Sequence, residues 1–220
     1  FENTDHPLLR KIASTGKPVI MSTGMATQEE LDESVAVLRE NGCKELILLK
    51  CTSAYPAPPE AINLRALDAL RQRYNVGVGL SDHTLGTGVA VAAVAQGAVV
   101  IEKHFTLKRS DGGVDAAFSM EPQEMTALVN DARLAQKALG SAQFGRATQE
   151  TASLAFRRSL FITEDIAKGT PLSPANTRII RPGYGLAPKH WDRVIGQVVN
   201  QDIPRGTPVS WSILTDSDVR

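Results

Sequence analysis

Two histidines follow successive apolar runs of the sequence, and each has a polar residue two positions before it. Ser81 and His83 end one predicted strand, and Glu102 and His104 end the next. Because alternate residues of a strand lie on one face, each pair points to the same side of the sheet. Neighbouring parallel strands end at one edge, so the two imidazoles could share a divalent ion such as Mn, Zn, Fe or Co. Two ordinary hydrogen-bonded histidines are the alternative.

A set of hydroxyl and ammonium groups falls at the same ends of the predicted strands. Its members are Ser22, Thr23, Lys50, Thr52, Ser53, Ser81 and Lys103. Such donors suit a phosphate or carboxylate, so the set as a whole predicts an anionic substrate. For any single serine or threonine, capping of the following helix is the simpler interpretation.

Two glycine-rich loops carry further candidate binding groups. Asp115 lies in RSDGGVDAAFS (109–119), where its carboxylate could reach a ligand or only form a turn. Arg181 opens RPGYG (181–185), which places a cation and an aromatic ring on a loop suited to a lid or a partner surface. A solvated surface arginine is the alternative there.

The elements that would position these groups alternate between short apolar runs and helical patterns. Strands are predicted at 18–22, 45–50, 76–80 and 98–105, and helices at 28–41, 61–74, 88–96 and 122–139. This alternation predicts a parallel sheet covered on both faces, hence a doubly wound sheet or a (β/α) barrel. Polar residues at every strand end, and no glycine-rich phosphate motif after the first strand, favour the barrel. Four strands are half of a (β/α)8 barrel.

The chain is expected to contain two domains. A small polar segment at 141–155 predicts a linker between a partial barrel at 1–140 and a second domain at 156–220. In the second domain, DIAKGTPLS (165–173) recurs as DIPRGTPVS (202–210). Its Gly-Thr-Pro turns predict a compact, turn-rich β module. Apolar runs that could form its strands are at 160–163 and 194–199.

Composition excludes several classes of function. The 220 residues carry 24 Lys+Arg against 24 Asp+Glu, so nothing in the net charge favours binding to nucleic acid or to an anionic membrane. The longest weakly polar run, 86–101, is shorter than the roughly 20 residues that a bilayer requires. Only Cys43 and Cys51 are present and no secretory leader is seen, so a reducing, cytoplasmic setting is expected.

Several strings of the sequence resemble the sialic acid synthase family. They are STGMA (22–26), SDHTLG (81–86), EKHFTL (102–107) and the repeat-bearing tail. Members of this family carry a (β/α)8 barrel followed by a small antifreeze-protein-like (SAF) domain, and the similarity covers nearly the whole chain. Finer strings are most similar to the branch of the family that forms pseudaminic acid. They are KCTSAYPAPPE (50–60), RSDGGVDAAFS and RPGYGL (181–186).

The resemblance implies a carbon–carbon bond-forming reaction. Phosphoenolpyruvate would condense with an open-chain N-acylated amino sugar and water, giving a nine-carbon 2-keto sugar acid and inorganic phosphate. The expected sugar is 2,4-diacetamido-2,4,6-trideoxy-L-altrose and the expected product is pseudaminic acid. Synthesis of N-acetylneuraminic or legionaminic acid is the alternative within the family.

The resemblance also implies how metal and phosphoenolpyruvate are held. His83 and His104 match the ligands of a divalent metal, expected to be Mn²⁺, with Mg²⁺ or Co²⁺ as alternatives. Such an ion would polarise the sugar aldehyde as a Lewis acid. Residues that match the phosphoenolpyruvate site are Ser22, Ser53 and Ser81, although some relatives have asparagine at the position of Ser53.

Four further residues are expected at the reaction centre. Glu2, Tyr55 and Asp115 match positions at the sugar and the reacting atoms, and Glu2 is a candidate for proton transfer. Glu102 is a further carboxylate that could stabilise the positive charge developing on the enol carbon.

The tail is expected to complete the site of a second subunit. Phe156 and Arg181 match residues that the SAF domain lends to the barrel of its partner, which implies a domain-crossed homodimer. The family pattern includes a Lys-Ile-x-Ser segment that supplies two further phosphate ligands. It is expected directly before Phe1 and so lies outside these 220 residues. The chain is therefore interpreted as lacking the N-terminal half-barrel, with exposed sheet edges and no activity on its own.

Two rival functions are considered. One is another phosphoenolpyruvate-dependent aldol condensation that makes a 3-deoxy sugar acid, against which the tail domain argues. The other is a non-catalytic carbohydrate-binding or assembly module built on the repeat-bearing tail. The combination of Ser81, His83, His104 and Asp115 in the barrel argues against a purely structural role.

Overall fold

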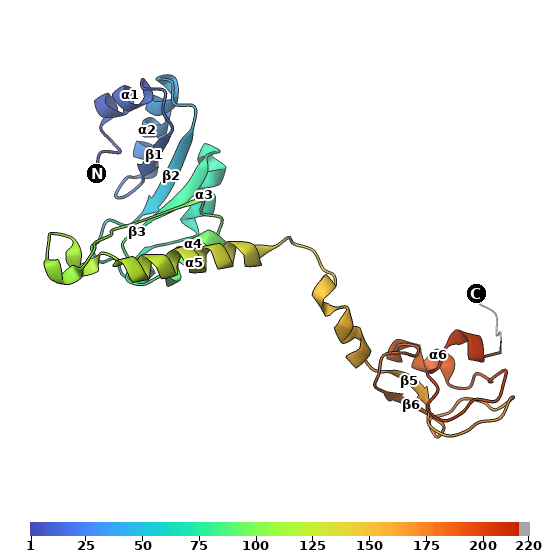
Figure 1. Cartoon of the computed structure of the whole chain (residues 1–220). Coiled ribbons are helices and arrows are strands. Elements are labelled where there is room, and N and C mark those ends of the chain that lie inside the picture. The colour runs from blue at the N-terminus through green and yellow to red at the C-terminus, as the bar shows by residue number, and fades with distance from the viewer. Residues whose placement is uncertain (216–220) are drawn as a thin grey trace. The chain divides into compact units, whose positions relative to one another are not determined.

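The computed structural model of the protein describes residues 1–215. The chain divides into two compact units, the first of residues 1–141 and the second beginning at Ala142, and both are drawn in Figure 1. In the described part of the chain, no helix combines the length and the apolar character that crossing a bilayer requires.

The first unit is built on a parallel sheet in the order β1-β2-β3-β4, so strands that follow one another in sequence are neighbours in space (Figure 1). The strands are β1 (Val19–Ser22), β2 (Leu46–Cys51), β3 (Gly77–Asp82) and β4 (Val100–Lys103). The helices are α1 (His6–Ala13), α2 (Gln28–Glu40), α3 (Ala66–Tyr74), α4 (Gly88–Ala95) and α5 (Pro122–Leu139), with 3₁₀ turns η1 (Pro59–Ala61), η2 (Arg109–Asp111) and η3 (Ala116–Phe118). A doubly wound sheet would reverse its strand order at a switch point, whereas this order is that of a barrel. The predicted half-barrel is thereby confirmed.

Alternation along the strands divides the sheet into a face covered by helices and an open face. On the covered face, Leu48 and Leu80 are fully buried in a continuous core with the helices. Burial of one such leucine side chain contributes about 1.5–3 kcal/mol. On the open face, Ile20 is 55% exposed. Gly79 is required on that face, because a Cβ there would lie 2.4 Å from the backbone oxygen of Val100 on β4.

Hydrogen bonds at the helix ends show why two of the helices begin where they do. At α2, Thr27 Oγ1 accepts the N–H of Glu30 at 3.3 Å, and the Glu30 carboxylate accepts the N–H of Thr27 at 2.7 Å. At α1, Asp5 accepts the N–H of Leu8 at 3.0 Å and Pro7 stands in the first turn. Helix α1 has no counterpart among the predicted helices, because its eight residues are too few for a clear helical period.

Two predicted boundaries in the first unit are wrong. The helix expected after the proline-rich segment starts later, as α3, because Asn63 has a φ of 51°, which an α-helix does not accommodate. The strand expected at 98–105 is shorter, because Phe105 forms an isolated bridge to Met120 instead of continuing the ladder of β4. That bridge brings the end of the loop after β4 back beside the sheet.

The second unit is a turn-rich β module, as predicted. It contains the antiparallel pair β5 (Ser159–Ile162) and β6 (Thr177–Ile180), one turn of helix α6 (Trp191–Val194), and the 3₁₀ turns η4 (Thr148–Glu150), η5 (Ala152–Phe156), η6 (Pro188–His190) and η7 (Trp211–Ile213). The strand expected at 194–199 is wrong. Val194 ends α6, and Val199 forms a single bridge with Leu214. The apolar run there fills the core of the unit instead.

The two copies of the internal repeat pair with each other. The N–H of Ile166, in the copy at 165–173, donates to the carbonyl oxygen of Ile203 at 3.0 Å. The N–H of Ile203, in the copy at 202–210, donates back to Ile166 at 2.8 Å. Both isoleucines are buried in the core of the unit. Equivalent residues of the two copies therefore make equivalent bonds across a local two-fold arrangement.

An aspartate of each copy closes the turn of the other copy. Asp202 Oδ1 accepts the N–H of Lys168 at 2.7 Å, and Asp165 Oδ1 accepts the N–H of Arg205 at 2.7 Å. Each bond satisfies a backbone donor in a Gly-Thr-Pro turn that has no strand partner at that position. The recurrence seen in the sequence is therefore a reciprocal set of contacts in the structure.

We expect Asp165→Ala to destabilise the second unit. The substitution leaves the N–H of Arg205 without its acceptor, which lowers the free energy of unfolding by about 0.5–1.5 kcal/mol. Both tryptophans, Trp191 and Trp211, lie in this unit, so tryptophan fluorescence during urea unfolding reports on it selectively. Glu164→Ala, at the adjacent exposed position, is the matched control. Equal midpoints for the two variants would contradict the proposed role of the bond.

Candidate functional site

The ends of the parallel strands bring the predicted polar residues to one edge of the sheet. The register places Ser81 of β3 opposite Cys51 of β2 on one side and Glu102 of β4 on the other. Ser81 Oγ donates a hydrogen bond of 2.7 Å to Glu102 Oε1. Ser22, the last residue of β1, lies opposite Leu49, so the same edge continues across all the strands of the sheet.

Beyond that edge, four aromatic rings gather into what we call the ring cluster, formed by Tyr55, His83, His104 and Phe118. The ring centres of the two histidines are 5.2 Å apart. Tyr55 lies 4.4 Å from His83 and 5.7 Å from His104. Phe118 lies 5.1 Å from His104 and 5.6 Å from Tyr55. Sequence reasoning selected the first three residues and missed Phe118, which no motif distinguishes from a loop phenylalanine.

The orientation of the His83 ring is fixed by the backbone. Its Nδ1 lies 3.0 Å from the carbonyl oxygen of Thr52. Because a carbonyl only accepts, Nδ1 donates in this contact, and Nε2 is the nitrogen left for another partner. Cys51 Sγ lies 3.9 Å from the same Nδ1. An imidazole whose Nδ1 donates to a backbone carbonyl is the arrangement that metal-binding histidines commonly have.

His104 faces the loop after β4 through Asp115. His104 Nδ1 and Asp115 Oδ2 are 3.5 Å apart, and the Asp115 side chain is 53% exposed. Ser119 Oγ donates a hydrogen bond of 2.7 Å to the carbonyl oxygen of Asp115, which holds the backbone at that point. The structure thus brings the predicted Asp115 to the ring cluster through a loop.

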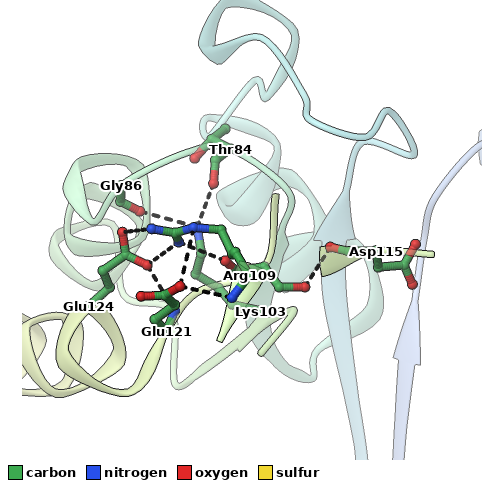
Figure 2. A network of polar contacts seen from close by, with 8 residues as sticks. Thr84, Gly86, Lys103, Arg109, Asp115, Glu121 and Glu124 are labelled. Carbon is green, nitrogen blue, oxygen red and sulfur yellow. Dashed lines mark hydrogen bonds and ion pairs between the residues drawn. The ribbon is translucent and has the colours of Figure 1, made fainter. Parts of the chain in front are cut away.

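That loop is closed by Arg109 (Figure 2). Its guanidinium donates to both carboxylate oxygens of Glu124 and, at 3.0 Å, to the carbonyl oxygen of Ser119. The backbone N–H of Arg109 donates to Glu121 at 2.9 Å. The hydrogen bond from Arg109, assisted by the backbone N–H of Glu121, lowers the pKa of Glu124. Sequence reasoning did not single out Arg109, because its partners are separated from it by ten to fifteen residues.

Lys103 does not face the proposed anion site, so that expectation is wrong. Its side chain is 3% exposed and its Nζ lies 3.0 Å from Asp82 Oδ2, itself fully buried. Lys103 also donates to the carbonyl oxygens of Thr84 at 2.7 Å and Gly86 at 3.2 Å, as Figure 2 shows. Asp82 Oδ1 accepts two more hydrogen bonds from Thr84. The ammonium group of Lys103 therefore links the ends of β3 and β4 and is not available to bind an anion.

Lys50 is likewise engaged by its own strand end. Its Nζ donates to the carbonyl oxygen of Cys51 at 2.6 Å and to Thr52 Oγ1 at 3.2 Å. Burial of the ammonium group lowers the pKa of Lys50. Both lysines expected beside an anion are therefore engaged by neighbouring groups of their own strand ends.

The turn after β1 lies closely against Ser53 and Cys51 at the end of β2. A Cβ on Gly24 would lie 2.4 Å from Ser53 Oγ and 3.0 Å from Cys51 Sγ, so only glycine fits there. Asn3 holds the same turn from the other side, because its Nδ2 donates to the carbonyl oxygens of Ser22 at 3.1 Å and Gly24 at 3.0 Å. Asn3 was not selected from the sequence, although its side chain is buried.

The structure does not bring Glu2 to the ring cluster. Its side chain is 72% exposed. None of the hydrogen bonds and ring contacts that Tyr55, His83 and His104 make within residues 1–215 involves Glu2. The expected proton-transfer role of Glu2 stays a prediction.

In the second unit, the two predicted residues Phe156 and Arg181 are neighbours. Arg181 Nε donates a hydrogen bond of 2.7 Å to the carbonyl oxygen of Phe156. The Phe156 ring is 70% exposed, as is that of Tyr184 on the same loop as Arg181. The N–H of Gly183 donates to Ala155 at 3.0 Å and ties this loop to the end of η5. The unit therefore presents a cation and two rings together on its surface.

The ring cluster offers two imidazoles to a divalent ion, so water or substrate atoms would have to supply the remaining ligands. Among residues 1–215, no three His, Cys, Asp or Glu side chains group into a metal site. His83 and His104 supply two imidazoles, one of them with its Nδ1 donating to a backbone carbonyl. Imidazole nitrogens combined with water or substrate oxygens suit divalent ions of the first transition series.

Comparison with known proteins assigns both units. A model of the NeuB family matches residues 1–144. The chain belongs to the NeuB family. A model of the SAF domain matches residues 157–215. The first unit is thus the C-terminal half of a NeuB-family TIM barrel, and the second is an SAF domain.

Named NeuB relatives cover most of this chain. The pseudaminic acid synthase of Campylobacter jejuni serotype O:23/36 is 41% identical over 220 residues, which are 100% of this chain and 63% of the relative. The N,N'-diacetyllegionaminic acid synthase of Campylobacter jejuni serotype O:2 is 40% identical over 205 residues, 91% of this chain and 61% of the relative. The chain therefore spans somewhat less than two thirds of the length of these curated relatives.

A solved structure supports the barrel. The N-acetylneuraminic acid synthetase of Leptospira borgpetersenii, crystallised with citrate, superposes with a TM-score of 0.64 at 33% identity. The match covers 71% of this chain and 54% of that chain.

We expect Lys103→Met to destabilise the first unit strongly. The change leaves Asp82 buried without its counter-charge, which costs about 3–5 kcal/mol. The double variant Asp82→Leu/Lys103→Met removes both charges and should recover most of that loss. Urea unfolding followed by circular dichroism at 222 nm reports on this unit, which holds α1 to α5. Lys108→Met, at an exposed position of the following loop, is the control, and a loss as small as in this control would refute a stabilising pair.

Proposed function

We propose that the complete gene product containing residues 1–220 is a pseudaminic acid synthase. It would condense phosphoenolpyruvate with 2,4-diacetamido-2,4,6-trideoxy-L-altrose and water, and release inorganic phosphate. The observation that carries this proposal is the 41% identity to a pseudaminic acid synthase along all 220 residues. The gathering of Tyr55, His83, His104 and Asp115 at one end of the sheet supports it.

In this proposal, hydroxyl groups at the strand ends hold phosphoenolpyruvate. Ser22, Ser53 and Ser81 would donate to its phosphate and carboxylate, because hydrogen bonds to an anion are stronger than those between neutral groups. In this structure Ser81 Oγ donates its one proton to Glu102 at 2.7 Å, so the hydroxyl would turn away from Glu102 to donate to phosphoenolpyruvate. Glu102 is thus one hydrogen bond from the proposed anion site, where its negative charge would stabilise positive charge on the enol carbon.

The acceptor sugar would lie over the ring cluster. His83 and His104 would hold a divalent ion, proposed to be Mn²⁺, which when bound supplies Lewis-acid polarisation of the aldehyde. C3 of phosphoenolpyruvate forms the new bond to the aldehyde carbon, whose oxygen takes a proton. Water adds to C2 and loses one proton, which balances the proton taken by the aldehyde oxygen. The C2–O bond to phosphate then breaks as the new C2 hydroxyl passes its proton to the departing phosphate, leaving the 2-keto acid. Asp115, beside His104, would hold a proton or a sugar hydroxyl in this sequence.

The SAF domain would complete the site of a second subunit. Phe156 and Arg181 are neighbours on its surface and are joined by a hydrogen bond of 2.7 Å. An exposed ring beside a cation is suited to a polar, anionic ligand. We therefore propose a homodimer whose tails cross, in the cytoplasm, where phosphoenolpyruvate is available.

The same site would also accommodate related sugars. The 40% identity to an N,N'-diacetyllegionaminic acid synthase favours legionaminic acid synthesis as a second candidate, and the solved relative acts in N-acetylneuraminic acid formation according to its name. The three reactions share phosphoenolpyruvate and phosphate release, so the acceptor sugar alone distinguishes them.

Phosphate release should depend on the sugar supplied. We expect the complete gene product, with phosphoenolpyruvate and Mn²⁺, to release phosphate with 2,4-diacetamido-2,4,6-trideoxy-L-altrose and at least about tenfold more slowly with N-acetylmannosamine. Residues 1–220 assayed alone should release none, because the sheet is half of a barrel. Faster release with N-acetylmannosamine would overturn the substrate, and release with neither sugar would overturn the reaction.

His83→Ala should weaken metal binding. Removal of one of two imidazole ligands is expected to lower Mn²⁺ affinity by at least about tenfold, measured by electron paramagnetic resonance titration without substrates. His6→Ala removes a partly exposed histidine of α1 and is the control. Mn²⁺ affinity that is unchanged in His83→Ala would show that the ion does not bind at the ring cluster.

A further inference from the structure

Phe118 belongs to the ring cluster but has no part in the reaction proposed above. Its ring centre lies 5.1 Å from His104 in an edge-on arrangement and 5.6 Å from Tyr55. The residue is partly buried, so some of its surface is free for another contact. A phenyl ring has no group that donates or accepts a conventional hydrogen bond or transfers a proton, which restricts its role to shape and apolar contact.

The backbone on either side of Phe118 is held in place. Ser119 is buried, its Oγ donates to the carbonyl oxygen of Asp115 at 2.7 Å, and its own carbonyl oxygen accepts from Arg109 at 3.0 Å. The N–H of Met120 donates to the backbone carbonyl oxygen of His104 at 2.9 Å, which holds the end of the loop beside the end of β4. These bonds hold the backbone that carries the ring before any ligand binds. A contact made by Phe118 therefore costs little conformational entropy. The Arg109 part of this network is visible in Figure 2.

Tyr55 extends the same apolar surface from another loop. Its ring packs on both histidines and on Phe118, and the residue is 41% exposed. The two rings thus form a wall beside the imidazoles, whereas the serine hydroxyls and Glu102 lie at the strand ends and Asp115 lies beside Nδ1 of His104. This division suits a ligand that is polar at one end and apolar at the other. Phosphoenolpyruvate, with its charged groups, matches the strand ends and not the wall.

We propose that Phe118, together with Tyr55, contacts the methyl end of the acceptor sugar and so determines specificity for a 6-deoxy sugar. This inference rests on the proposed function, in which the acceptor carries a methyl group where N-acetylmannosamine carries a hydroxymethyl group. A hydroxyl buried against Phe118 would lose its hydrogen bonds to water without replacement, whereas a methyl group gains apolar contact. The preference therefore comes from the wall and not from the groups that carry out the reaction.

The test compares both sugars in variants of the complete gene product. We expect Phe118→Ala to lower the ratio of kcat/KM for the trideoxy sugar over N-acetylmannosamine by about tenfold, mainly through a higher KM for the trideoxy sugar. Phe118→Leu keeps most of the apolar volume and is expected to fold. It should lower the ratio of kcat/KM less than Phe118→Ala does. Val114→Ala removes a 99% exposed side chain of the same loop and is the matched control.

A direct contact measurement accompanies the kinetics. Saturation-transfer NMR on the trideoxy sugar, without phosphoenolpyruvate, should show strong transfer to the C6 methyl in the wild type and weak transfer in Phe118→Ala. If the wild type uses the trideoxy sugar but both Phe118 variants keep its ratio and its transfer, the inference is wrong and the proposed function stands. If the wild type uses neither sugar, the proposed function fails and the inference falls with it.

Discussion

The buried ion pair between Asp82 and Lys103 is the interaction on which the candidate site depends. Asp82 lies between Ser81 and His83 in sequence, and Lys103 lies between Glu102 and His104. Because side chains alternate along a strand, a charge pair on one side of the sheet is accompanied by the site residues on the other. The pair sets how far apart the ends of β3 and β4 lie, and with them the two imidazoles. An uncompensated charge in that position would be costly, so the two strand ends stay joined.

A second level of organisation comes from the loops that leave these strand ends. The loop after β2 brings Tyr55 over His83, and the carbonyl oxygen of Thr52 in the same loop accepts a hydrogen bond from that histidine. The loop after β4 returns to its own strand through Met120 and is closed by Arg109. Backbone carbonyls and a guanidinium therefore carry out the positioning, while the groups suited to chemistry remain free on one side. Sites of (β/α) barrels are built in this way, from the loops at the C-terminal ends of the strands.

The parts of the fold and site that sequence could predict are those governed by short-range periodicity. Alternation in β3 and β4 was sufficient to pair Ser81 with Glu102 and His83 with His104. The same alternation places Lys103 on the opposite side of the sheet from Glu102, which is where it pairs with Asp82. Phe118 and Asn3 could not be found in this way, because their partners lie on other elements and no spacing rule connects them. The apolar run at 194–199 of the SAF unit was predicted to be a strand. A segment that is buried in a core without forming a strand has the same run of apolar residues, so the sequence does not distinguish the two.

The reciprocal bonds of the internal repeat have a consequence for how the SAF domain tolerates change. Asp165 caps a turn in the second copy and Asp202 caps a turn in the first, and the two isoleucines exchange backbone bonds. Neither copy therefore has a complete set of partners within its own stretch of chain. A proteolytic cut or a premature stop that removed the later copy would also strip the earlier copy of its acceptors. The domain is thus expected to survive or be lost as a whole, and its two halves are constrained to evolve together.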